Sequence, residues 1–256
     1  MMHHNIDCSI CFSFYCYISM WIDKVNLVWN RANRYEIDRG NRDYVVVRAA
    51  KGSTIGPIGE RLDLADALDK LFAWLSAYER AGAPSTSMEK VTRRRQRAEK
   101  ELLTWFDQFG QLGAPLCVPP SFEPKHREGK DWWSSPVYSR EVVDDMAYFV
   151  LNLRTLVQRI VGQPMGGFGE QAVSTISEGA ARVRRNPETL QWEAPTFWCL
   201  LCEAVLNYED LKWDFRICAA SDCTNPFVVT RSNRTMCSKR CSKRMWAQRQ
   251  VGTRLA

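Results

Sequence analysis

Apolar residues recur at helical spacing over much of the chain. In residues 62–80 the repeated residue is leucine, at Leu64, Leu68, Leu71 and Leu75. Residues spaced three or four apart share one face of an α-helix, so this segment is expected to form an amphipathic helix. A capping box at Thr86 and Glu89 then predicts the start of a second helix, which should end near Phe109. Its buried side chains are expected to be Val91, Leu102, Trp105 and Phe106.

Two more helices are expected in the second half of the chain. One should run from about Arg140 to Val161 with Ser139 as its N-cap. Its buried stripe would consist of Val143, Met146, Val150, Leu153, Val157 and Ile160. The other helix is expected over residues 194–211. Cys199 and Cys202 lie three residues apart on its apolar face, and we interpret them as core residues rather than metal ligands.

Signals for β-structure are few. Three adjacent valines in "DYVVVRA", residues 43–49, favour an extended strand. Residues 170–192 are compatible with a hairpin or a short helix, and the hairpin is the preferred prediction. Residues 110–138 are rich in Pro, Gly and Trp and read as a long connection. The expected fold class is therefore mainly α with a small β component.

The chain is expected to divide into three regions. Residues 1–19 are interpreted as an extension outside the fold. The uncharged run there, Cys8 to Ile22, has 15 residues, fewer than the ~20 that a membrane span needs. Residues 20–212 should form a mainly helical domain. Residues 213–256 should form a small zinc finger that ends in a basic helix. No membrane partner is expected.

The net charge of +6 is distributed unevenly along the chain. From Cys218 to Ala256 there are eight Arg and Lys residues and one acid, Asp222, a balance of +7. The remaining residues carry 27 basic and 28 acidic side chains, a balance of −1. A neutral body with a basic end predicts a polyanionic partner such as nucleic acid. The alternative is a solvated helix whose charge serves only solubility.

The cysteine spacing predicts a metal site. Cys218 and Cys223 form one close pair, Cys237 and Cys241 form a second, and thirteen residues separate the pairs. Two close pairs are typical of a tetrahedral Zn²⁺ site. Four thiolates leave no open coordination position, so a structural rather than a catalytic role is expected. Clustered pairs in a long chain also favour metal binding in a reducing compartment, which we expect to be the cytoplasm.

The chain between the two cysteine pairs is expected to form a hairpin. Residues 227–229 would be one strand, residues 231–234 a polar turn, and residues 235–236 the returning strand. Ser238 would then help to start a helix. Cys237 and Cys241 would face the metal from its first turn, where the positive end of the helix favours thiolate. A hairpin pair and a helix-start pair together suggest a treble-clef-like finger.

These residues, "CAASDC…F…R…CSKRCSKRMWAQR", resemble the C-terminal CGNR-type zinc finger of bacterial proteins. The resemblance implies that the four cysteines are the ligands, that Phe227 is a packing aromatic and that Arg244 is the arginine of the signature. Two features differ: the second pair is one residue closer than in that family, and "CSKR" replaces "CGNR". Many proteins of the family have a variable, helical N-terminal region and are regarded as DNA-binding regulators.

The expected function is zinc-dependent DNA binding in transcription regulation. The residues predicted to contact nucleic acid are Arg231, Arg234, Lys239, Arg240, Lys243, Arg244 and Arg249. The alternative is a structural or protein-interaction module in which zinc only holds the finger together. An enzyme is not expected, because the chain has no HExxH, P-loop, deaminase or nucleophile-elbow motif. The sequence does not indicate a small-molecule ligand or an oligomeric state.

Overall fold

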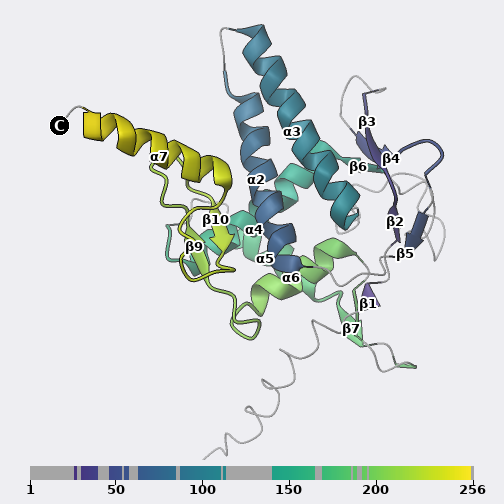
Figure 1. The fold of residues 1–256 in the computed structure, drawn as a ribbon. Helices are drawn as coiled ribbons and strands as arrows, with labels where there is room; N and C mark the ends of the chain where they lie inside the picture. The colour runs from purple at the N-terminus through teal and green to yellow at the C-terminus, as the bar shows by residue number, and fades with distance from the viewer. Residues whose placement is uncertain are drawn as a thin grey trace, which may run out of the picture.

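The computed structural model describes residues 26–27, 30–39, 46–53, 55–57, 63–84, 87–110, 112–113, 140–164, 169–185, 187–188, 192–194 and 196–254. The predictions for residues 1–19 and for most of the 110–138 connection lie outside these ranges. Within them the fold is mainly helical with small groups of strands, as expected (Figure 1). None of the helices in the described ranges combines the length and the apolar character that crossing a membrane requires.

Helices α2 (Leu64–Gly82) and α3 (Met88–Phe109) form an antiparallel hairpin (Figure 1). The indole N–H of Trp105, near the end of α3, donates to the carbonyl of Ala67, near the start of α2, at 3.0 Å. The N-cap of α3 is Ser87, whose hydroxyl accepts from the Lys90 amide at 3.4 Å. The prediction of Thr86 as the cap was therefore wrong by one residue.

The predicted buried face of α3 is correct except at its first turn. Leu102, Trp105 and Phe106 are buried, but Val91 is only half-buried. The reason is the position of Val91 near the tip of the hairpin, which projects from the rest of the body (Figure 1).

Helix α4 begins later than predicted. Residues Arg140–Val142 form strand β6, and α4 runs from Val143 to Ile160. Strand β6 pairs antiparallel with β4 (Val46–Ala49), so residues 140–142 extend the sheet rather than start the helix. The predicted stripe of α4 is buried except for Ile160, which is partly buried against the core.

Residues 170–192 contain a helix that the hairpin prediction missed. Helix α5 spans Gly169–Ala180, and only the segment after it is a hairpin, formed by β7 (Arg184–Arg185) and β8 (Trp192–Ala194). Helix α5 packs closely on α6 (Phe197–Leu206). A Cβ added to Gly179 would lie 2.7 Å from the sulfur of Cys202, so the two helices approach each other at a glycine.

The strands of the first 57 residues lie at the edge of the body away from α7 (Lys239–Arg254), as Figure 1 shows. Strand β3 (Tyr35–Asp38) pairs antiparallel with β4, and β2 (Asn30–Ala32) pairs antiparallel with β5 (Ile55–Pro57). Strand β1 (Asn26–Leu27) pairs parallel with β8. Strand β4 confirms the predicted strand over residues 46–49, and residues 43–45 of that prediction lie outside the described residues.

The helices α2, α3, α4 and α6 meet in one hydrophobic core. Trp105, Phe109 and Phe197 form an aromatic cluster within it, with ring centroids 5.4 to 6.1 Å apart. Cys199 and Cys202 are fully buried in the same core, which confirms their interpretation as core residues. Because the core also includes Phe215 and Val228, the start of the cysteine-rich segment packs directly on the body.

Candidate metal centre and basic surface

The cysteine-rich segment begins with two short strands. Strand β9 (Phe215–Ile217) pairs antiparallel with β10 (Pro226–Val228), so the strand partner of β10 comes before the first cysteine pair. The prediction that residues 235–236 would be that partner was wrong. Those residues instead lie beside the first pair, where the amide of Ala219 donates to the Thr235 carbonyl at 3.0 Å. This contact brings the second cysteine pair back towards the first.

Each cysteine pair is held by local hydrogen bonds. In the first pair, the Cys223 amide donates to the Ala220 carbonyl at 2.9 Å and closes a tight turn. In the second pair, the Ser238 hydroxyl accepts from the Cys241 amide at 3.3 Å, as an N-cap does. The predicted role of Ser238 at the start of the helix is confirmed. Cys237 lies just before α7 and Cys241 lies in its first turn.

The four sulfur atoms of Cys218, Cys223, Cys237 and Cys241 all lie within 4.8 Å of one another. The sulfur of Cys237 is 3.6 Å from that of Cys223 and 3.6 Å from that of Cys241. A tetrahedral site with Zn–S bonds of ~2.3 Å has sulfur atoms ~3.8 Å apart, whereas a disulfide has them ~2.05 Å apart. The spacing therefore fits four ligands around one ion and does not fit a disulfide.

The protonation of the thiols also fits a metal site. The pKa of the Cys223 thiol is lowered to about 5, mainly because the thiol of Cys237 donates a hydrogen bond to it. The pKa of Cys237 is raised far above its usual range by that same hydrogen bond and by burial. Burial also raises the pKa of Cys218. Thiolates at this distance repel one another, and a bound metal ion would offset that repulsion.

Two donors from the protein point at the sulfurs. The guanidinium of Arg244 donates to the Cys241 sulfur at 3.2 Å, and the Cys237 amide lies 3.5 Å from the Cys218 sulfur. Such hydrogen bonds stabilise thiolates and orient metal ligands. Four sulfur donors with this arrangement favour a soft or borderline ion such as Zn²⁺.

The apolar surroundings of the four thiols are small. Cys218, Ala220 and Cys241 are the buried members of this cluster, with Met236 and Met245 partly buried against it. So few buried groups stabilise only weakly, and a metal would supply most of the cohesion of this end of the chain.

Arg234 anchors the cysteine-rich segment to the body. Its guanidinium pairs with the Asp69 carboxylate of α2 at 2.6 Å and donates to the carbonyls of Val228 and Cys237. It also lies over the Phe227 ring at 4.8 Å. The side chain of Asp69 is 9% exposed and accepts from the Val228 amide at 2.8 Å. Burial raises the pKa of Asp69 to about 6, against the opposing effects of this amide and of Arg234.

A second polar contact lies beside this ion pair. The hydroxyl of Ser76 in α2 donates to the side-chain oxygen of Asn225 at 2.6 Å, and both side chains are buried. The side chain of Gln158 in α4 donates to the Thr224 carbonyl at 3.2 Å. The first cysteine pair is thus joined to two helices of the body by side-chain hydrogen bonds.

The cations predicted to contact nucleic acid differ in their surroundings. Those left exposed are Arg231, Lys239, Arg240 and Lys243. Arg234 is engaged in the joint with α2, and Arg244 pairs with Asp222 besides contacting Cys241. The side chain of Arg249 lies outside the described residues. The positions of these side chains do not test whether they contact nucleic acid. Nucleic-acid binding therefore stays a prediction for all seven residues.

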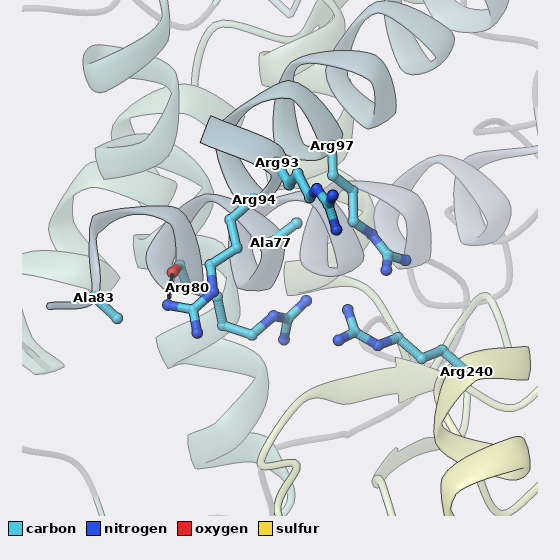
Figure 2. Close-up of a pocket in the computed structure, with 7 residues that line it drawn as sticks. All are labelled: Ala77, Arg80, Ala83, Arg93, Arg94, Arg97 and Arg240. Atoms are coloured by element: carbon cyan, nitrogen blue, oxygen red, sulfur yellow. Dashed lines mark hydrogen bonds between the residues drawn. The ribbon is translucent and has the colours of Figure 1, made fainter. Parts of the chain in front are cut away.

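The structure adds four arginines of the α2–α3 hairpin to this surface. Arg80 of α2 and Arg93, Arg94 and Arg97 of α3 line a cleft together with Arg240 of α7 (Figure 2). Burial and the charges of Arg97, Arg80 and Arg244 lower the pKa of Arg240. The run "RRRQR", residues 93–97, is the only sign of this cleft in the sequence of α3. A charge run on a helix is more often a solvated face, so the run alone does not indicate a binding site.

Comparisons with family models, with curated proteins and with solved structures found no match for this chain. The resemblance to the CGNR-type finger therefore depends on the residues quoted above.

Proposed function

We propose that this chain is a zinc-dependent DNA-binding protein that regulates transcription through its cysteine-rich end. The observation that carries this proposal is the position of the four thiols at the start of α7. This helix contains no acidic residue, and its cations Lys239, Arg240 and Lys243 are exposed. A metal held there would fix the orientation of a cationic helix, which is the arrangement that phosphate contacts and groove binding need.

Further support comes from Trp246, whose side chain is 66% exposed on α7. A large exposed aromatic side chain among cations is suited to stacking on a base or packing against a sugar. The resemblance to the bacterial CGNR-type finger supports the same function, because the proteins of that family are regarded as DNA-binding regulators. Under this proposal the helical body would sense a ligand or dimerise.

The test is a binding assay of the metal-loaded full chain with labelled DNA and RNA pools at low and at moderate salt. Binding should weaken as salt rises, because cation–phosphate contacts release counterions. The Lys243→Ala variant should bind about fivefold more weakly. A matched control is Lys51→Ala, which removes the same charge from an exposed position near the strands, away from α7. No binding to either pool at low salt would exclude the proposed function.

A second candidate is favoured by the joint between the cysteine-rich segment and the body. The Arg234–Asp69 pair and the Ser76–Asn225 hydrogen bond dock the segment on α2. If the segment only docks on the body, the metal centre serves to hold the fold together or forms part of a protein-interaction surface. In that case Lys243→Ala and Lys51→Ala would behave alike in every binding assay and in the host cell.

A further inference from the structure

A cleft of about 380 Å³ lies between the α2–α3 hairpin and the start of α7. Five arginines from three helices line it: Arg80, Arg93, Arg94, Arg97 and Arg240. Figure 2 shows the side chains of Arg80 and Arg240 reaching towards each other from α2 and α7, with Arg97 beside them. The only other lining residues are Ala77 and Ala83, so the described wall of the cleft contains no acid.

Three of these arginines have no acidic partner in the part of the chain that the structure describes. Arg93 pairs with Glu89 and Arg97 pairs with Glu101, both within α3. Among the described residues, no carboxylate forms an ion pair with Arg80, Arg94 or Arg240. Arg95 of α3, which does not line the cleft, pairs with Glu99 at 3.3 Å. Glu101 offsets part of the repulsion on Arg240, but burial and the charges of Arg97 and Arg80 still lower the pKa of this arginine. A bound anion would reduce the remaining repulsion.

The basic surface continues beyond this cleft. An adjoining cavity of about 520 Å³ shares Arg80, Arg97 and Arg240 with it and reaches Lys239 and Arg244 beside the metal centre. Cations of the body and of the cysteine-rich segment therefore line two adjoining cavities, and Glu101 also lines the second.

We propose that the arginine cleft binds phosphate groups, with Arg80, Arg94 and Arg240 as the residues that contact them. Phosphate suits the cleft better than a single carboxylate does. It offers three or more acceptor oxygens around one centre, so guanidinium groups from different helices can bind it at once. The phosphates come either from the backbone of a nucleic acid or from a free oligophosphate. The inference goes beyond the proposed function because Arg80 and Arg94 belong to the body, and it does not require α7 to bind DNA.

The variants for the test are Arg80→Ala and Arg94→Ala, with Arg95→Ala as the matched control. Arg94 and Arg95 are neighbours on α3 and their loss changes the charge equally, but only Arg94 lines the cleft. All variants are used as the full, metal-loaded chain. Their metal content and thermal unfolding are measured first, so that a folding defect is recognised.

The first arm measures binding of a DNA duplex as a function of salt. If the cleft holds backbone phosphates, Arg80→Ala and Arg94→Ala should each weaken binding by about tenfold at low salt. Each should also reduce the slope of log K against log salt concentration by about one, as expected for one lost phosphate contact. Arg95→Ala should leave the slope unchanged. The second arm measures binding of inorganic tripolyphosphate by calorimetry with the same variants.

A loss confined to the cleft variants in the duplex arm assigns the cleft to a nucleic acid backbone. The same loss in the tripolyphosphate arm alone assigns it to a free oligophosphate. If Arg80→Ala and Arg94→Ala match Arg95→Ala in both arms, or if the unaltered chain binds neither ligand, the inference is overturned. The proposed function is judged separately, because DNA binding that depends on Lys243 but not on Arg80 or Arg94 would retain it while removing the phosphate cleft.

Discussion

Cysteine has two distinct roles in this molecule. Cys199 and Cys202 lie on the apolar face of α6 and are fully buried among aromatic and leucine side chains. Burial raises the pKa of the Cys202 thiol, which keeps it protonated and unreactive. Cys223 and Cys237, by contrast, are only partly buried and have sulfurs 3.6 Å apart. The surroundings of each thiol, rather than its residue type, decide whether it can bind a metal.

Replacing one thiol of the cluster should abolish metal binding. In Cys241→Ser, three sulfurs and a poorer oxygen donor remain, so the zinc content should fall from about one ion per chain to near zero. In Cys202→Ala, about one zinc ion should be retained, although the cavity would lower the free energy of unfolding by about 1–2 kcal/mol. Elemental analysis of the two purified variants measures this. Equal zinc content in both variants would contradict the assignment of the ligands.

At the scale of elements, the joint between α2 and the cysteine-rich segment combines a buried acid with a cation that has several partners. Asp69 accepts from the Val228 amide and pairs with Arg234, which in turn holds the Cys237 carbonyl. One ion pair thus connects α2, β10 and the second cysteine pair. Loss of either charge should therefore loosen both the docking and the metal site.

Arg234→Met should leave the Asp69 carboxylate buried without a counter-charge. The free energy of unfolding should fall by about 2–3 kcal/mol, less than for a fully buried pair because Arg234 is partly exposed. The control Arg216→Met removes an exposed partner of Asp214 and should cost less than about 1 kcal/mol. Urea unfolding of the single variants and of Arg234→Met combined with Asp69→Asn gives the coupling between the two charges. A coupling near zero would contradict this account.

The same variant should show a pH dependence of definite sign. The pKa of Asp69 is about 6 in the folded chain, above its ordinary value of 3.8. Between these two pH values the folded chain therefore keeps Asp69 protonated more than the unfolded chain does. Ionisation of Asp69 therefore lowers stability as pH rises through about 6, and removing Arg234 raises its pKa further. The destabilisation by Arg234→Met should be larger at about pH 7.5 than at about pH 5.5. Equal destabilisation at both pH values would show that the lost hydrogen bonds to the carbonyls of Val228 and Cys237, not the ion pair, dominate.

A further prediction concerns the contact between α5 and α6. In Gly179→Ala, the new methyl group would lie 2.7 Å from the Cys202 sulfur and 2.9 Å from the Trp198 indole nitrogen. The free energy of unfolding should fall by about 1–3 kcal/mol through overpacking. Gly82→Ala, where nothing lies within 4 Å, should be neutral or slightly stabilising because alanine favours the helix. Thermal unfolding of both variants measures the difference, and equal midpoints would contradict the close packing of the two helices.

At the scale of the whole molecule, two hydrophobic clusters of very different size support the structure. The larger includes the helices of the body and reaches Phe215 and Val228 in β9 and β10. The smaller has Cys218, Ala220 and Cys241 as its buried members. The effect of the metal should therefore be local. It should be strong for the residues around the thiols and for α7, and weak for strands that already belong to the larger core.

Removal of metal by a chelator should separate these two parts. Amide hydrogen exchange should rise by about tenfold or more over residues 218–225 and 235–250, because their remaining buried area is small. Strand β10 and helices α2 and α6 should keep their protection, since the larger core holds them. Exchange measured by mass spectrometry before and after chelation gives the comparison. Protection lost across the whole chain, or unchanged in α7, would contradict a local role for the metal.

Helical periodicity and cysteine spacing already indicated much of this molecule. The leucines of α2, the stripe of α4 and the spacing of the four cysteines are local patterns, and their physical cause acts within a few residues. A short helix was the less favoured alternative for the segment of α5, because several of its buried positions are small residues, such as Ala172 and Gly179, which give little hydrophobic signal. Strand β6 escaped because pairing with β4, far away in the chain, decided its conformation.

Long-range packing decided what local patterns could not. The pairing of β10 with β9, the burial of Asp69 under Arg234 and the position of Arg80, Arg94 and Arg240 around one cleft each depend on contacts between separate segments of the chain. The sequence of a basic run does not show whether its helix faces solvent or a second basic element. Only the docking of α7 beside the α2–α3 hairpin turns separate arginines into a cleft, because repulsion and binding depend on distances in space rather than on spacing along the chain.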